Sequence, residues 1–189
     1  MSGIEIRPAT ADDHDAIREV ILAAFAEEPG VADVVEELRA TRRAWHELVA
    51  TDGATVVGHV MLNRGWVDDD LRVVDVLVLS PLGVAPDYQQ GGIGTELIAA
   101  ALDAARAAGE ALVFLEGAPD YYGARGFERA DRRGFLAPTS RIPAPAFQVA
   151  VLQDPDASGR LVYPDAFWAA HAAGLRDPEL SRLRELLGD

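Results

Sequence analysis

Cysteine and lysine are both absent from the 189-residue sequence. Without cysteine, the chain can form no disulfide, no thiolate-bound zinc site and no cysteine nucleophile. Any catalysis must therefore use other side chains. The absence of lysine means that all 17 of the strongly basic residues are arginines.

Positive charge is scarce as well, because these 17 basic residues face 31 acidic ones and leave a net charge of -14. Nucleic acids and anionic lipid surfaces are bound through basic protein surfaces. We therefore expect neither a nucleic-acid partner nor a membrane partner. Two readings of the acidic surface stay open: it serves solubility, or it attracts cationic amines.

Long apolar runs are also missing, since none approaches the roughly 18 residues that a membrane-spanning helix needs. The opening stretch "MSGIEIRPATADDHD" lacks the basic and apolar regions of a signal peptide, so we expect a cytoplasmic protein. An apolar fraction of 49% suits a compact core. We expect one domain over residues 1–152 and a C-terminal extension over residues 153–189 that packs on it.

The N-terminal half mixes helical and β patterns. Alternation in "IEIRPAT" predicts a short strand, and the apolar spacing of residues 11–28 predicts a helix with acids in its first turn. Asp52-Gly53 joins two β-rich runs as a hairpin over residues 46–67. Between helix and hairpin, after a break at Pro29-Gly30, a second and less regular helical segment is indicated by Val34, Val35, Leu38, Trp45 and Leu48.

The centre of the chain predicts a βαβ unit. Residues 71–84 are apolar almost without pause, as in a central strand covered on both faces. "ALVFLEG", residues 111–117, is the next strand, and a helix between them makes the two strands parallel. Gly109 ends this helix, whose apolar stripe consists of Ile93, Leu97, Ile98, Ala101, Leu102 and Ala105.

The C-terminal third contains shorter elements. We expect a short helix around "PDYYGARG", a strand from Phe127 and another strand at "AFQVAVLQ". A last helix carries Leu180, Leu183 and Leu187 on one stripe, which packs on the domain or, alternatively, on a second subunit.

The stretch "QQGGIG", residues 89–94, stands between the central strand and the long helix. A helix N-terminus exposes unpaired N–H groups, and glycines remove the side chains that would keep a phosphate away. The turn therefore indicates a pyrophosphate site, although a tight connection is the simpler alternative. No Gly-Lys-Ser/Thr follows, so it is not a P-loop, and the neighbouring hairpins fit a dinucleotide fold poorly.

The stretch "LGVAPDYQQGGIGTELI" resembles the acyl-CoA motif of the GNAT N-acetyltransferase superfamily, V-x-P-x-x-Q-x-x-G-x-G. "YYGARGF" resembles the second signature of that superfamily, and "VFLEGAPDYYGARGFERA" with "VYPDAF" is most similar to its YhbS-like bacterial branch. The residues at the motif positions are Val84, Pro86, Gln89, Gly92 and Gly94.

This resemblance implies an α+β fold with a mixed, mostly antiparallel sheet, a parallel βαβ unit, splayed central strands and helices on both faces. It implies acetyl-CoA, or another acyl-CoA, as cosubstrate and no metal. The Val84 N–H would polarise the thioester carbonyl, and Gln89 would brace the turn or touch phosphate. The implied cofactor-binding residues are Leu82, Gly83, Val84, Gln89, Gln90, Gly91, Gly92, Ile93, Gly94 and Thr95.

The resemblance also implies a general acid, because a tyrosine with a pKa near 10 can protonate a departing thiolate. Tyr122 occupies that position, with Tyr121 as the alternative. A carboxylate is needed to deprotonate the acceptor, and the candidates are Glu116, at the end of the strand 111–117, and Asp75, within the central strand. The glutamate that the family often carries near Val78 is missing, so the base stays open between them, and either carboxylate could instead be structural.

The sequence thus predicts transfer of an acetyl or other short acyl group from acyl-CoA to an amine by direct attack. The acceptor, a small molecule or a protein, stays open, and we expect its cavity between the first helices and the loop "RRGFLAPTSRIPAPAF". The family makes a homodimer a mild expectation. Two alternatives stay open: a non-catalytic acyl-CoA-binding or sensory module, and an oligomeric scaffold that uses the last helix.

Overall fold

The computed structural model describes residues 3–28, 30–154 and 156–188. The chain folds as two compact units, which are described one at a time. Strands β3 (Thr55–Asp68) and β4 (Val73–Val84) each have one end in unit 1 and the other end in unit 2. Unit 1 is made of Met1–Asn63 and Leu79–Ala108, and unit 2 of Arg64–Val78 and Gly109–Asp189.

Unit 1 contains an antiparallel sheet in the order β1, β2, β3, formed by Ile4–Pro8, Ala44–Asp52 and the first part of Thr55–Asp68. The β2–β3 hairpin turns at Gly53, which has a φ of 59°. Positive φ is the conformation for which glycine is suited. The hairpin predicted at Asp52-Gly53 is confirmed.

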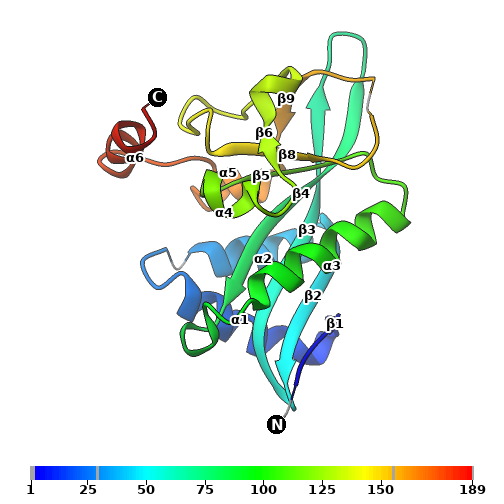
Figure 1. The fold of residues 1–189 in the computed structure, drawn as a ribbon, viewed down its shortest axis with the longest axis vertical. Helices are drawn as coiled ribbons and strands as arrows, with labels where there is room; N and C mark the ends of the chain where they lie inside the picture. Colours follow the sequence, from blue (N-terminus) through cyan, green and yellow to red (C-terminus); the bar gives the residue numbers. More distant parts are fainter. Residues whose placement is uncertain (1–2, 29, 155, 189) are drawn as a thin grey trace. The chain divides into compact units, whose positions relative to one another are not determined.

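Helices cover both faces of this sheet (Figure 1). Side chains alternate along a strand, so Val49 and Ala50 point to opposite faces. Val49 packs with residues of α1 (His14–Ala24) and α2 (Gly30–Ala40). On the other face, a Cβ added to Gly58 would lie 3.0 Å from Leu97 of α3 (Ile93–Ala107). The apolar stripe predicted for α3 is buried at every position.

One local expectation is wrong: Trp45 and Leu48 lie in β2 and not in a helix. The helix α2 ends at Ala40, and Arg42 has a left-handed φ of 58°. Leu48 pairs with β1 on one side and with β3 on the other. Hydrogen bonding to two neighbouring strands overrides the helical spacing of these apolar residues. The break expected at Pro29 lies outside the described residues.

Unit 2 contains the parallel pair that the βαβ pattern predicts. Strand β4 (Val73–Val84) pairs with β5 (Leu112–Glu116), with Leu77 opposite Val113 and Val78 opposite Phe114. Strand β5 also pairs with the antiparallel β8 (Phe147–Val151). The sheet is therefore mixed, as expected.

Three phenylalanines form the centre of unit 2. The Phe114 ring meets Phe135 edge-on at 5.0 Å between ring centroids and stacks on Phe147 at 5.6 Å. Such edge-on and offset pairs are favoured geometries for aromatic rings. All three side chains are fully buried.

The C-terminal extension takes part in the sheet of unit 2, which the sequence pattern did not predict. Strand β9 (Gly159–Val162) pairs with the end of β3, where Trp66 lies opposite Val162, and with β7 (Phe135–Leu136). No helix in the described part of the chain is long and apolar enough to cross a membrane. The remaining elements of unit 2 are β6 (Glu128–Arg129), β7 (Phe135–Leu136), α4 (Pro119–Gly123), α5 (Asp165–Ala169) and α6 (Glu179–Leu187).

Candidate active site

The glycine-rich turn lies between the end of β4 and the start of α3. Gln90 has a φ of 63° and Gly92 a φ of 91°, so the chain passes twice through the left-handed region. Nothing lies within 4 Å of the position that a Cβ would take on Gly92. Glycine is therefore needed at 92 for its backbone conformation, and the space beside it is open.

The amides of this turn are arranged as at other helix N-termini. The N–H groups of Thr95 and Glu96 donate to the Gly92 carbonyl at 2.9 and 3.1 Å. The amides before them, from Gly91 to Gly94, precede the hydrogen-bonded ladder of α3. Together with the positive end of the helix dipole, they form the kind of surface that binds phosphate.

Hydrogen bonds inside unit 1 hold the turn in place. The Gln89 side-chain amide donates to the Val84 carbonyl at 3.0 Å, and the Ala85 N–H donates to the Val57 carbonyl at 2.9 Å. The Tyr88 hydroxyl donates to Asp52 at 3.3 Å. Gln89 thus braces the turn against the end of β4.

The predicted cofactor-binding residues from Leu82 to Thr95 all belong to unit 1. Gly83 is buried, and a Cβ there would lie 2.9 Å from Ile21 and 3.4 Å from Ala24. Helix α1 therefore packs directly on the backbone of β4 beside Val84. Any larger residue at 83 would push the helix away from this strand.

Tyr122 lies on α4 in unit 2, and its ring covers Gly117. A Cβ on Gly117 would lie 2.8 Å from Tyr122 Cδ2, so a side chain at 117 would displace the ring. Burial raises the pKa of Tyr122 to about 12, with a further increase from Tyr121 that Arg125 opposes. The phenol therefore keeps its proton at every physiological pH.

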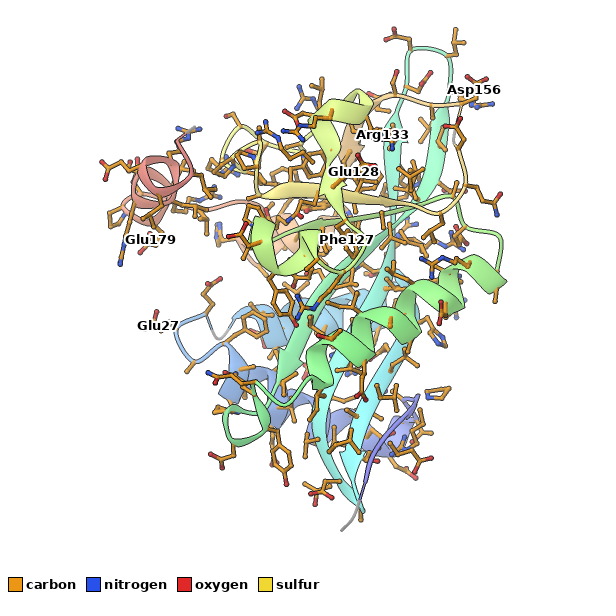
Figure 2. The ribbon with its side chains drawn as sticks, in the orientation of Figure 1. Glu27, Phe127, Glu128, Arg133, Asp156 and Glu179 are labelled. Carbon is orange, nitrogen blue, oxygen red and sulfur yellow. The ribbon has the colours of Figure 1, made fainter. Side chains whose placement is uncertain are left out.

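The neighbours of Tyr122 fix its position. Its ring meets Tyr121 edge-on at 4.9 Å and Phe127 at 5.9 Å between centroids. Phe127, labelled in Figure 2 just before β6, is buried, as expected for a core residue. Tyr121 is 36% exposed and its ring lies 3.6 Å beneath the guanidinium of Arg125.

The two candidate bases have different surroundings, both within unit 2. Asp75 is exposed, because the start of β4 is open to solvent and the strand becomes buried only from Val76. Glu116 is half-buried at the end of β5 and lines a cavity of about 260 Å³. Burial raises the pKa of Tyr163 well above its ordinary value, and the charge of Glu116 raises it further.

Unit 1 contains a buried charged cluster that the sequence pattern did not reveal. Glu47 accepts hydrogen bonds from Arg39 at 2.6 Å and from His59 Nε2 at 3.1 Å. His59 is completely buried, and burial lowers its pKa although Glu47 opposes this. Among the described residues His59 Nδ1 has no hydrogen-bond partner. A neutral His59 with its proton on Nε2 agrees with both observations, because Nε2 then donates to Glu47 and Nδ1 carries no proton that needs an acceptor.

The histidine and acidic side chains of the described residues do not form a metal site. Over 3–28, 30–154 and 156–188, no group of three or more histidine, aspartate or glutamate side chains is placed to hold a metal ion. His14 and His46 belong to unit 1, and His171 belongs to unit 2.

Comparison with known proteins agrees with the motif and the fold. Residues 5–130 match the family model described as Acetyltransferase (GNAT) domain. The uncharacterised N-acetyltransferase YjhQ of Escherichia coli strain K12 is 34% identical over 130 residues, which is 67% of this chain and 71% of that protein.

Two solved structures are similar over most of the chain. YhbS of Escherichia coli, a GNAT family N-acetyltransferase in complex with CoA, is 28% identical with a TM-score of 0.81, covering 88% of this chain and 93% of its own. A GNAT family acetyltransferase of Brucella melitensis in complex with acetyl-CoA is 26% identical with a TM-score of 0.74, covering 88% and 99%. The similarity to YhbS agrees with the branch that the sequence resembles. The domain match and the YjhQ relationship together show that the chain belongs to the GNAT acetyltransferase family.

Proposed function

We propose that the chain transfers an acetyl group from acetyl-CoA to a primary amine, with the turn Gln89–Thr95 as the pyrophosphate site. The backbone of the turn is the main support for this proposal. Gln90 and Gly92 have left-handed conformations just before α3, and the space beside Gly92 is open. The related structures from E. coli and B. melitensis contain CoA and acetyl-CoA.

The turn residues have separate roles in this proposal. The amides of Gly91 to Gly94 would donate to the pyrophosphate oxygens. Gln89 donates to the Val84 carbonyl, which supports a role in holding the turn. The Val84 N–H would donate to the thioester oxygen as negative charge develops on it.

When bound, acetyl-CoA supplies an acetyl thioester whose carbonyl carbon an amine can attack. The base would remove one proton from the ammonium, and the amine nitrogen would bond to the carbonyl carbon as the C–S bond breaks. The nitrogen would then lose a second proton, which replaces the one that the phenol gives to the sulfur. Tyr122 donates its phenolic proton to the departing sulfur. A pKa of about 12 keeps this proton in place until the thiolate forms.

Glu116 is the better base of the two candidates. It lines a cavity beside residues of α4, the helix that carries Tyr122, whereas Asp75 is exposed near the start of β4. An ammonium held at Glu116 would lose its proton within the cavity. Cytoplasmic location and a homodimer stay predictions from the sequence.

The test of the turn is acetyl-CoA binding to Gly92→Ala, measured by titration calorimetry. A methyl group above the amides should weaken binding about tenfold, and the left-handed backbone should cost about 1–2 kcal/mol of stability. Gly109→Ala is the matched control, because Gly109 has a φ of 78° and open space but lies beyond the other end of α3. Its stability should fall similarly while its affinity for acetyl-CoA stays unchanged.

Two results would argue against the proposal. Equal acetyl-CoA affinities in Gly92→Ala and the wild-type protein would exclude the turn as the pyrophosphate site. Binding without release of thiol on a broad panel of amines would instead favour a non-catalytic acyl-CoA-binding module.

A further inference from the structure

The cavity beside Glu116 is built from three separate segments of unit 2. Residues 116–119 follow β5, residues 141–146 precede β8, and three leucines come from the C-terminal extension. These leucines are Leu175, Leu183 and Leu187. The last two lie on α6, which begins at Glu179, labelled in Figure 2.

The extension is held against the loop by hydrogen bonds. The Arg141 guanidinium donates to the Ala173 carbonyl at 3.2 Å, and the Leu175 N–H donates to the Arg141 carbonyl at 3.2 Å. Arg184 of α6 donates to the Ser140 carbonyl at 2.7 Å. The loop before β8 and the C-terminal extension therefore form one wall of the cavity.

The chemistry of the wall suits a ligand with an apolar body and one polar end. All of the lining residues except Glu116 and Arg141 are apolar or glycine. The Arg141 guanidinium donates to the Ala173 carbonyl of the C-terminal extension. The wall thus contains one charged side chain of each sign, and Glu116 is the one that an ammonium group would contact.

The cavity adjoins the residue proposed as general acid. Gly117 lines the cavity, and the Tyr122 ring lies directly over the same glycine. Ala118 and Pro119 line the cavity as well, and Pro119 is the first residue of α4. An amine held at Glu116 would thus lie on the segment that carries Tyr122.

We propose that this cavity binds the acceptor, a primary amine with an aliphatic or phenyl body that contacts Leu183 and Leu187 while its ammonium group faces Glu116. The proposal rests on the acetyl transfer proposed above and names its substrate class. The C-terminal extension then determines specificity, because two of its helical residues contact the apolar body.

Leu183→Trp should test this directly, because a larger side chain fills the cavity. We expect the affinity for phenethylamine, measured by titration calorimetry, to fall at least tenfold. The matched control is Leu186→Trp on the same helix, since Leu186 is 74% exposed and does not line the cavity. Its affinity should stay at the wild-type value.

Glu116→Gln gives a second measurement that leaves the apolar wall intact. It should weaken phenethylamine binding about tenfold, since a charge-assisted contact is lost. Phenethyl alcohol, which has the same body without the charge, should bind both proteins equally. Equal phenethylamine affinity in the wild type, Leu183→Trp and Glu116→Gln would overturn the proposal, as would no binding to the wild type.

The outcome separates this proposal from the proposed acetyl transfer. If Leu183→Trp loses phenethylamine binding but the wild type releases no thiol from acetyl-CoA with any amine, the cavity is an amine site and the transfer proposal fails. If the wild type acetylates phenethylamine and Leu183→Trp has an unchanged KM for it, the transfer stands and the cavity proposal fails.

Discussion

The two units bury their polar groups in different ways. In unit 1, buried acids are paired: Glu47 with Arg39 and His59, and Asp13 with Arg7 and Thr10. The bonds from Arg7 hold the pKa of Asp13 far below its usual range. In unit 2, burial is the main cause of a pKa shift at two described phenols, and it raises the pKa values of Tyr122 and Tyr163.

This difference indicates which side chains are suited to chemistry. A buried charge whose partners are all in the protein stabilises the fold and is costly to disturb. A buried phenol stays neutral and keeps a proton that it can donate. The turn of unit 1 would then contact acetyl-CoA mainly through its backbone, and in unit 2 the side chain suited to giving up a proton is a phenol.

The largest expected effect is that of a substitution at Tyr122, the buried phenol proposed as general acid. Tyr122→Phe removes the proton donor while keeping the ring over Gly117, so the rate constant for acetyl transfer should fall between about 100- and 10,000-fold. Acetyl-CoA affinity, measured by calorimetry, should not change. Thiol release under saturating substrates measures the rate.

Tyr121→Phe is the control for this experiment, because Tyr121 is partly exposed and its ring is covered by Arg125. It should retain nearly the full rate. If Tyr121→Phe were the slower variant, the general acid would be assigned to the wrong tyrosine.

A smaller effect is expected from the paired charge in unit 1. Burial would raise the pKa of Glu47, but hydrogen bonds from His59 and Arg39 outweigh it and lower the pKa from 4.5 to about 2. The folded state therefore binds this proton more weakly than the unfolded state. This corresponds to about 3 kcal/mol of stability at neutral pH, of which about 2 kcal/mol is lost by pH 3.

Urea unfolding of the wild type and Glu47→Gln from pH 7 to pH 3 measures the contribution of Glu47 to the free energy of unfolding. The variant should be less stable at pH 7, and the difference should narrow as the pH falls through the interval from 4.5 to 2. The lowered pKa of His59 acts in the same direction and begins to reduce stability below about pH 6.5. Glu36→Gln, which alters an exposed pair with Arg18, is the control for the substitution itself and should change the stability at pH 7 far less than Glu47→Gln. A constant difference between wild type and Glu47→Gln would show that Glu47 has no shifted pKa.

The turn could be predicted from the sequence because its requirements are local. The left-handed backbone at 92 requires a glycine, and the buried face of α3 requires apolar residues at helical spacing. Both requirements are met by residues that are close together in the sequence. The paired cluster of Arg39, Glu47 and His59 could not, because a helix and two strands bring these residues together. Pairing between strands also explains why the helical spacing of Leu48 gives a wrong prediction.

The cavity beside Glu116 could not be predicted from the sequence either. Its lining residues between 116 and 187 come from three segments that only the folded unit brings together. The sequence predicts that Leu183 and Leu187 share one apolar stripe, but an i, i+4 pair does not indicate what it faces. Glu116 is a candidate from the sequence because it lies at the end of a predicted strand.

The smallest expected effect is that the rate of acetyl transfer does not fall at high pH. This result would distinguish a buried phenol from an exposed one. With a pKa of about 12, Tyr122 stays protonated throughout the range in which an exposed tyrosine, with a pKa near 10, would lose its proton. The rate of acetyl transfer should therefore rise as the acceptor amine is deprotonated and should show no decline up to about pH 10.5. Thiol release, corrected for the spontaneous hydrolysis of acetyl-CoA, measures this profile. A decline with an apparent pKa between 9 and 10 that Tyr122→Phe removes would mean that the acidic group is exposed, and the contrast between the two units would then not extend to the reaction.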